Sequence, residues 1–445
     1  MVAVSLLAAG CSRGGEAVEE PAIAATTSDF GDLKGVCQGG APSGSPAQGV
    51  TAGEIAIGVP TDMGFTKKSE LVDAAYVFTS WCNAAGGVNG RRLVVNVRDS
   101  KLMESRQRMI EACREDFALV GGGFALDGAS VEERLKCLLP EFPAQIVDAR
   151  NTGSDLQIGG GTGIGRPYNP YSGLQRWLVQ TYPGSASAIG IIAGDSPATK
   201  AMLPKYEEGL GAVGGAVTYT ELYPATGVAD WTPYAQSIKS KGVRGLVFLG
   251  DFRSLAKLEE VLTGMDYKLD WIDANANAYQ PAFIELAGRS VAVQNNVADL
   301  GGTAPLESAD EVPAVRQVQE LFARYAPDKQ LTYPALRAFS SWLLFAKAAA
   351  ACGNELTRRC VYEAAAAESA WTAGGLQAPM DMKPGSATPP KCFNIVKATP
   401  QGFEPADFGP DTGQFRCDAT PYVYKNDYGK PATLADVGKS YEDFR

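Results

Sequence analysis

The sequence contains no histidine among its 445 residues. This absence excludes Ser-His-Asp and Cys-His nucleophile pairs, histidine ligands to a metal, and an imidazole that shuttles protons. The chain carries 40 Lys and Arg against 50 Asp and Glu, which gives a formal net charge of −10. Because contacts to nucleic-acid phosphates need clustered basic side chains, this balance argues against a nucleic-acid partner. The composition therefore predicts a protein that is not an enzyme and that has no metal and no cofactor.

Beyond its first residues, the chain also lacks any apolar run long enough to span a bilayer. Its apolar share of 45% and its charged share of 20% are typical of a globular protein. The length allows two domains of ordinary size or three small ones. We therefore expect a globular protein with more than one domain.

The N-terminal segment has the pattern of an export signal. Met1–Ala9 is apolar, and Leu7-Ala8-Ala9-Gly10-Cys11 resembles a bacterial lipobox, in which the cysteine takes a diacylglycerol. Residues 1–11 are therefore expected to be a signal peptide with a lipobox, and residues 12–49 a flexible tether. The prediction is an exported protein whose Cys11 anchors it to the outer face of the cytoplasmic membrane, or a periplasmic one. A frayed N-terminus with a chance cysteine is the alternative, since no Lys or Arg precedes the apolar run.

Eight cysteines remain after Cys11, and an even number in an exported chain favours disulfides. They are Cys37, Cys82, Cys113, Cys137, Cys352, Cys360, Cys392 and Cys417. Metal ligands or free thiols are the alternatives, although the chain has no CxxC pair and no histidine to build a zinc site. Cys352 and Cys360 would close a short loop. Cys392 and Cys417 flank two strand-like runs and would clip a hairpin.

Along the chain, apolar runs of strand length alternate with segments of helical periodicity. The predicted strands span residues 54–60, 92–97, 117–120, 144–147, 188–193, 216–223, 245–249 and 269–272. The predicted helices span residues 71–85, 103–116, 130–139, 199–213, 233–241 and 254–265, and a helix-rich stretch follows over 312–351. Two consecutive βαβ series indicate an α/β protein with two doubly wound lobes, each with a mainly parallel sheet.

Several segments in order resemble one family. Residues 55–60 (Ile-Ala-Ile-Gly-Val-Pro), 83–91 (Asn-Ala-Ala-Gly-Gly-Val-Asn-Gly-Arg) and 223–233 (Tyr-Pro to Thr-Pro) are similar to segments of branched-chain amino-acid-type solute-binding proteins. These are type I periplasmic binding proteins that serve ABC importers. The resemblance covers roughly residues 49–375, and Pro281-Ala-Phe-Ile-Glu-Leu-Ala-Gly288 also falls where the family places it.

The resemblance implies two Rossmann-like lobes joined by a three-strand hinge, with a small ligand trapped between them. The first lobe would comprise residues 50–168 and 277–370, and the second residues 169–276 and 371–445. The implied partners are a small-molecule ligand and ABC permease subunits, with the membrane reached through the lipid anchor only, and the protein is expected to be a monomer. A ligand-sensing module that docks onto a signalling partner is the alternative function.

The family's strand order, 2-1-3-4-5, also implies two disulfides. Right-handed crossovers would place the second and third helices side by side, and Cys113 and Cys137 lie near the ends of those helices. Cys82 ends the first helix, at the sheet edge where the chain enters, so its partner would be Cys37.

By position, the resemblance also implies a set of ligand-binding residues in the loops and crossings that face the cleft. They are Thr61, Asp62, Phe65, Asp127, Ala149, Asn151, Thr152, Tyr168, Asn169, Asp195, Ser196, Asp251, Arg253 and Tyr279.

The chain departs from the family at the positions that would hold an amino acid. Ala125 falls where a hydroxyl is expected, Asn169 replaces an acid on the crossing loop, and Ser254 or Leu255 stands in place of a glutamate. Because a buried zwitterion needs both charges answered, the prediction is a small polar molecule and not an ordinary α-amino acid. An enzyme that pairs Asp127, Asp195 and Asp251 across the cleft, as glycosidases pair carboxylates, is a further alternative.

Overall fold

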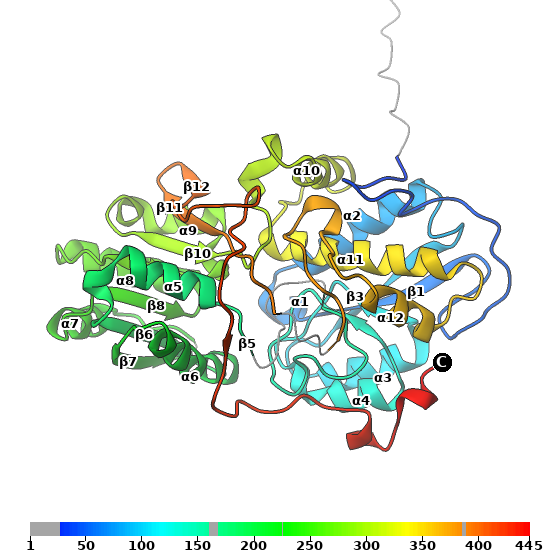
Figure 1. Cartoon of the computed structure of the whole chain (residues 1–445), viewed down its shortest axis with the longest axis horizontal. Coiled ribbons are helices and arrows are strands. Elements are labelled where there is room, and N and C mark those ends of the chain that lie inside the picture. Colours follow the sequence, from blue (N-terminus) through cyan, green and yellow to red (C-terminus); the bar gives the residue numbers. More distant parts are fainter. Residues whose placement is uncertain (1–26, 160–167, 225, 385–388) are drawn as a thin grey trace, which may run out of the picture.

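The computed structural model describes residues 27–159, 168–224, 226–384 and 389–445. Two α/β lobes lie side by side, each with helices on both faces of a central sheet (Figure 1). This is the doubly wound, two-lobe arrangement that the alternating sequence pattern predicts. Within the described ranges, no helix is long and apolar enough to cross a bilayer.

The first lobe is built on a parallel sheet with the strand order β2-β1-β3-β4. Its strands are β1 (Glu54–Thr61), β2 (Arg92–Asp99), β3 (Ala118–Val120) and β4 (Glu141–Phe142). The inward side chains of β1, Ile55, Ile57 and Val59, are fully buried, because helices cover the sheet on both faces. The helices of this lobe are α1 (Met63–Thr66), α2 (Glu70–Ala84), α3 (Ser105–Glu115), α4 (Val131–Lys136), α10 (Pro313–Tyr325), α11 (Tyr333–Cys352) and α12 (Arg358–Ala366).

The second lobe has the strand order β12-β11-β10-β9-β8-β6-β7, in which β7-β6-β8-β9-β10 form a parallel sheet. The strands are β6 (Ile189–Asp195), β7 (Val217–Pro224), β8 (Gly245–Leu249), β9 (Trp271–Asp273), β10 (Asn296–Asp299), β11 (Ile395–Thr399) and β12 (Gly402–Pro405). The antiparallel hairpin of β11 and β12 extends the sheet at its β10 edge. The helices are α5 (Ser172–Thr181), α6 (Pro197–Ala212), α7 (Thr232–Ser240), α8 (Phe252–Gly264) and α9 (Pro281–Ala287).

One predicted strand is wrong. The fourth strand of the first sheet is Glu141–Phe142, and residues 144–147 form a loop. Pro143 follows the strand directly and has no N–H to donate, so the ladder with β3 ends there. Ala144 N–H then donates to Gly122 O in the loop after β3.

The segment before β1 is also different from its prediction. Residues 27–49 are not a tether but pack onto the first lobe, where Phe30, Val36 and Cys37 are buried. Trp81 in α2 donates its indole N–H to Thr27 O at 3.0 Å. The aromatic face of α2 therefore needs this segment as a cover. The expected signal peptide, Cys11 and the rest of the tether lie outside the described residues.

The lobe boundaries fall later in the chain than predicted. Residues 277–299 belong to the second lobe, because β10 pairs with β9 and β11 and α9 packs against α8. The chain crosses back around residues 300–304, where Ala304 joins the core of the first lobe. Residues 371–382 remain with that lobe, since Trp371 and Met382 are buried in the same core.

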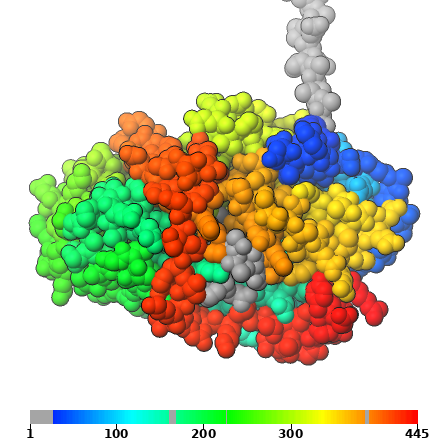
Figure 2. All heavy atoms as spheres, viewed as in Figure 1, coloured from blue at the N-terminus to red at the C-terminus, as the bar shows by residue number. Residues whose placement is uncertain are grey.

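The C-terminal segment, residues 422–445, connects both lobes and is called the strap below. Its start, β13 (Tyr422–Val423), pairs with β5 (Tyr168–Asn169) at the first crossing. Its end packs on α4, where Leu434 and Phe444 are buried. Figure 2 shows the strap running across the front of the molecule from the second lobe to the first. The prediction that residues 371–445 lie wholly in the second lobe is therefore wrong.

Glu208 of α6 holds the strap to the second lobe. Its carboxylate accepts hydrogen bonds from Tyr422 OH at 3.0 Å, Asn426 Nδ2 at 2.7 Å and Tyr428 OH at 2.6 Å, and from Lys425 N–H at 2.5 Å. Burial opposes ionisation, but these donors stabilise the anion and lower the pKa of Glu208 to about 2.

The structure contains all four predicted disulfides: Cys37–Cys82, Cys113–Cys137, Cys352–Cys360 and Cys392–Cys417. The second joins α3 to the end of α4, the two helices that the strand order places together. The last links the segment just before the β11–β12 hairpin to the chain that follows it.

The disulfides differ in the length of chain that they close, 45 residues for Cys37–Cys82 and 8 for Cys352–Cys360. We expect the double variant C37A/C82A to lose ~4 kcal/mol of stability and C352A/C360A ~2.5 kcal/mol, because a longer closed loop constrains the unfolded chain more. Urea unfolding of both variants beside the wild type measures the difference. Equal losses in the two variants would contradict this ranking.

A buried acid in α8 makes the stability pH-dependent. Glu259 is fully buried, and its only described hydrogen bond is accepted from Asn296 Nδ2 at 2.9 Å. Burial raises the pKa of Glu259 to about 8. The folded state thus keeps a proton that the unfolded chain releases near pH 4.5, so this group lowers the free energy of unfolding as the pH rises from about 5 to 8.

Replacing Glu259 by glutamine removes this titration and keeps an acceptor for Asn296. We expect E259Q to gain up to ~3 kcal/mol over the wild type between pH 5 and pH 8, measured by urea unfolding at both pH values. The exposed neighbour Glu260 supplies the control variant E260Q, for which no such gain is expected. A gain that does not depend on pH would rule out ionisation of Glu259 as its cause.

Candidate ligand-binding site

The loops at the carboxyl ends of the parallel strands form the candidate site, because open α/β sheets bind ligands at that edge. A contact between the lobes joins two of these loops. The Nζ atom of Lys68, in the loop between α1 and α2, lies 5.7 Å from the ring centroid of Phe252, the first residue of α8. Arg253 stacks on the same ring at 4.6 Å. The loop after β1 therefore faces the loop after β8 across the cleft.

In the first lobe, the predicted residue Asp62 binds three loops together. Its carboxylate accepts hydrogen bonds from Ala125 N–H at 2.5 Å and Leu102 N–H at 3.2 Å, and a further one from the Ser100 hydroxyl. Only 7% of Asp62 is exposed. The carboxylate thus satisfies donors of the loops after β2 and β3, and its oxygens already have partners within the lobe.

The carboxylate of Asp127 likewise joins the loops after β3 and β4 by accepting hydrogen bonds. It accepts from Val147 N–H at 3.0 Å, Asp148 N–H at 2.8 Å and Asn151 Nδ2 at 3.0 Å. Burial raises the pKa of Asp127, although these three donors favour the anion. Asn151 also accepts from Ser154 Oγ at 3.1 Å through its side-chain oxygen. Asp127 and Asn151 therefore hold the loop after β4 in place through hydrogen bonds within the first lobe.

Among the other predicted residues of the first lobe, Thr61, Ala149 and Thr152 have contacts within the protein, whereas Phe65 is exposed. Thr61 Oγ1 accepts from Met63 N–H at 3.2 Å, and Thr152 Oγ1 donates to Asp148 O at 2.9 Å. Ala149 lies against the strap, since a Cβ atom on Gly429 would come within 3.0 Å of its methyl group. Phe65, in contrast, is 60% exposed at the rim of the cleft.

At the crossings, the predicted residues take part in packing. Asn169 is buried, donates to Gln175 Oε1 at 2.7 Å and accepts from Tyr424 OH of the strap at 3.1 Å. Tyr168 pairs with Val423 through the backbone of β5 and β13. Tyr279 is also buried and donates its hydroxyl to Glu307, so it packs beneath the second crossing and does not face the cleft.

In the second lobe, the predicted side chains are more accessible. Asp195 forms an ion pair with Lys200 at 2.5 Å, and Ser196 caps α6 by accepting from Thr199 N–H at 3.3 Å. Asp251 and Arg253 lie on the surface 3.5 Å apart. Together with Phe65 and Lys68 of the first lobe, they are exposed charged and aromatic groups in the loops at the strand ends.

Two acids that sequence reasoning missed end neighbouring strands of the second lobe. Asp273 closes β9 and Asp299 closes β10, and they are 1% and 7% exposed. One oxygen of each accepts a backbone N–H, from Asn275 at 3.1 Å and from Gly301 at 2.7 Å. Neither Oδ2 atom has a hydrogen-bond partner among the described residues, and burial raises the pKa of both acids to about 7. An acid directly after a short apolar strand was the signal available in the sequence.

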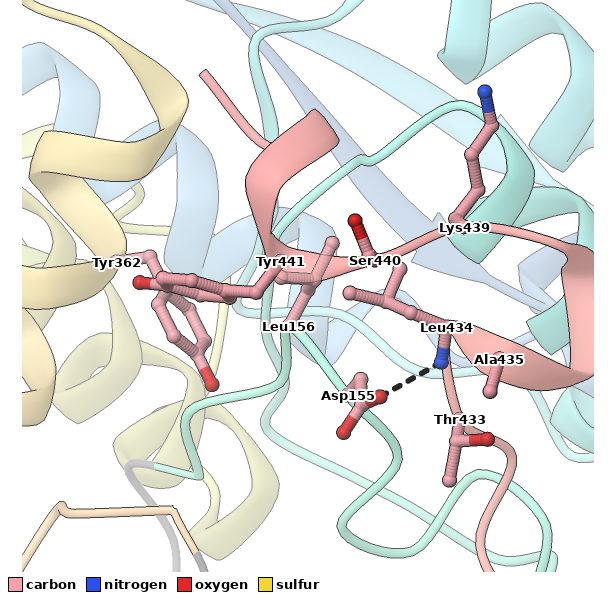
Figure 3. A pocket seen from close by; sticks show the side chains of 9 residues that line it. All are labelled: Asp155, Leu156, Tyr362, Thr433, Leu434, Ala435, Lys439, Ser440 and Tyr441. Carbon is pink, nitrogen blue, oxygen red and sulfur yellow. Dashed lines mark hydrogen bonds between the residues drawn. The ribbon is translucent and has the colours of Figure 1, made fainter.

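A separate pocket of about 340 Å³ lies on the first lobe beneath the strap (Figure 3). Its walls are Asp155, Leu156, Tyr362, Thr433, Leu434, Ala435, Lys439, Ser440 and Tyr441. Asp155 accepts the Leu434 N–H at 2.7 Å, so the pocket forms where the strap docks. It lies away from the strand ends, and we assign it to the anchoring of the strap.

Because Asp62 joins three loops within the first lobe, we expect its removal to cost more stability than the removal of the exposed Asp195. We expect D62A to lose ~2–4 kcal/mol of stability, because the Ala125, Leu102 and Ser100 donors would be left without an acceptor. The exposed ion pair of Asp195 predicts a loss of less than ~1 kcal/mol for D195A. Urea unfolding of the two variants gives the comparison, and similar losses would contradict the role of Asp62.

Two parallel-sheet lobes, linked by repeated crossings and facing each other with their strand ends, define a two-lobe ligand-binding protein of the type I class. A sequence model of the periplasmic binding protein family matches residues 164–403, more than half of the chain. The chain belongs to this family, as its motifs indicated. No curated protein matches the sequence significantly.

Solved structures with the same fold cover most of the chain. A fatty acid ABC transporter substrate-binding protein from Thermomonospora curvata has a TM-score of 0.65 and 17% identity, over 87% of this chain and 97% of its own. The leucine-binding protein LivK from Thermotoga maritima has a TM-score of 0.63 and 12% identity, over 80% and 97%. LivJ from Streptococcus pneumoniae, solved with isoleucine, has a TM-score of 0.60 and 16% identity, over 78% and 96%. At these identities the likeness concerns the fold.

Proposed function

We propose that the protein captures a small polar molecule between its lobes, outside the cytoplasm, and delivers it to an ABC importer. The contact of Lys68 with Phe252 carries the proposal, because it brings the ligand-binding edges of two parallel sheets together. Membership of the periplasmic binding protein family supports it. The names of the similar structures favour transport over the signalling alternative.

The arrangement of the acids gives no support to a carboxylate enzyme. Asp127 is held within the first lobe by hydrogen bonds from Val147, Asp148 and Asn151. Asp195 and Asp251 each have a cation beside them, Lys200 and Arg253. Such an enzyme needs two carboxyls directed at one bond, and these three side chains are engaged with other partners.

Export is part of the proposal. The four disulfides are typical of an oxidising compartment outside the cytoplasm. Anchoring through a lipid on Cys11 and a monomeric state complete the proposed arrangement, in which the membrane is reached through the anchor and through permease subunits.

A thermal-shift screen of amino acids, amides, ureas, aromatic acids and short peptides tests ligand capture, because a ligand that binds only the folded state raises the melting temperature. We expect at least one class to raise it, with calorimetry confirming the binding. If no compound of these classes raises it, the proposal of a small ligand of these kinds is wrong.

A variant of Arg253 tests where the compound that the screen identifies binds. We expect R253A to weaken binding of the identified compound at least ~10-fold, as loss of a direct charged contact does. Arg244 is the matched control, since it is equally exposed but precedes β8, at the opposite edge of the sheet. Equal effects of R253A and R244A would move the binding site away from the strand ends.

A further inference from the structure

The strap joins one element of each lobe that carries predicted site residues. In the second lobe it lies on α6, whose N-cap is Ser196. In the first lobe it lies along the loop after β4, where Ala432 N–H donates to Arg150 O at 2.7 Å and Asp155 N–H donates to Ala432 O at 3.1 Å. Both elements follow the carboxyl end of a parallel strand, β6 or β4. The strap is thus a connection between the two edges that would hold a ligand.

The two ends of the strap are held in different ways. On the first lobe, Leu434 and Phe444 are buried in an apolar cluster with residues of α4. On the second lobe, residues 424–430 are all at least partly exposed, and they are held on α6 by hydrogen bonds and by a contact of Lys205 with the ring of Tyr428 at 5.6 Å. Exposed hydrogen bonds are readily exchanged for bonds to water, whereas buried apolar side chains are not readily exposed. The contact with α6 is therefore the weaker of the two.

The link between these two anchors is short. Only residues 429–431 separate Tyr428, which donates to Glu208 of α6 at 2.6 Å, from Ala432 on the first lobe. The Cα atoms of Tyr428 and Ala432 are therefore at most about 14 Å apart, the reach of a fully extended chain of this length. Figure 1 shows this part of the strap between α6 and α4, below β5. Because opening about the crossings separates the parts that lie away from them, the docked link limits how far the lobes separate.

We propose that the strap acts as a latch, which is docked on both lobes in the closed form and whose residues 424–428 leave α6 when the lobes open. Glu208 is the positioning residue of the latch, because its carboxylate accepts the hydrogen bonds that fix this part of the strap to α6. In the structure the latch is docked, and the lobes touch through Lys68 and Phe252. Since opening requires loss of the Glu208 contacts, the docked strap shifts the ligand-free chain towards the closed form. The inference rests on the proposed function, because closure of the lobes is the step that would trap a ligand.

Small-angle X-ray scattering of the full chain, without any added compound, tests the latch in the variant E208A. The variant lacks the acceptor that holds the strap on α6, so we expect the radius of gyration to rise by about 1 Å from the ~22 Å typical of a compact chain of this length. E207A is the matched control, because Glu207 precedes Glu208 in α6 but accepts from Thr220 Oγ1 of β7 at 3.0 Å. We expect E207A to keep the wild-type radius of gyration.

A longer link tests whether the shortness of the strap limits opening. Inserting about six glycine and serine residues between Gly429 and Lys430 adds up to ~20 Å of reach and leaves the contacts with Glu208 in place. We expect this variant to show the same rise in the radius of gyration as E208A. Because the insertion lies in an exposed part of the strap, it tests the latch independently of any effect of E208A on α6.

Amide hydrogen exchange identifies which anchor is released. Lys425 N–H donates to Glu208 at 2.5 Å, and Leu434 N–H donates to Asp155 at 2.7 Å. Relative to the intrinsic rates, we expect the Lys425 amide of the wild type to exchange at least ~10-fold faster than the Leu434 amide. With the longer link the Lys425 amide should exchange more slowly than in the wild type, because the lobes then open while the strap stays on α6.

An unchanged radius of gyration in E208A or in the variant with the longer link would overturn the inference, and so would equal exchange at Lys425 and Leu434. Equal rises in E208A and E207A would assign the effect to α6 and not to the strap, which would overturn it as well. These measurements use no added compound, so their failure is distinguishable from a failed thermal-shift screen, which would contradict solute capture itself.

Discussion

In both lobes, the central parallel strands are buried on both faces, so their polar ligand-binding groups are confined to the loops at the strand ends. The strand β8 shows the constraint, since all five of its residues, Gly245–Leu249, are buried. Loops at such ends contain backbone N–H groups that need acceptors. The first lobe satisfies them with Asp62 and Asp127, and these hydrogen bonds hold its binding edge together. The ends of β9 and β10 in the second lobe also carry acids, Asp273 and Asp299. The Oδ2 atom of each has no hydrogen-bond partner among the described residues.

The path of the chain decides how the lobes are able to move. Capture by closure requires that the crossings bend while the sheets stay rigid. The strap adds a connection outside those crossings, fixed to α6 through Glu208 and to α4 through Leu434 and Phe444. Any opening of the lobes must move or stretch this segment, so the strap belongs to the hinge as much as the crossings do.

The family resemblance predicted which loops carry the candidate site residues but not the direction of their side chains. Phe65, Asp251 and Arg253 face solvent at the cleft, whereas Asp127 and Tyr279 point into their own lobe. The reason is physical: the direction of a loop side chain depends on donors from other loops. For Asp127 these are Val147 and Asp148, which no local pattern connects to it.

The sequence by itself determined the alternation of strands and helices, because periodicity follows from local geometry. The strand order within each lobe, and with it the pairs Cys37–Cys82 and Cys113–Cys137, was implied by the family resemblance. Only the tertiary structure decided that residues 27–49 cover α2, that β10 joins the second sheet and that the strap returns to α4. These contacts join segments far apart in the chain, and each depends on an apolar surface that exists only after both partners have folded.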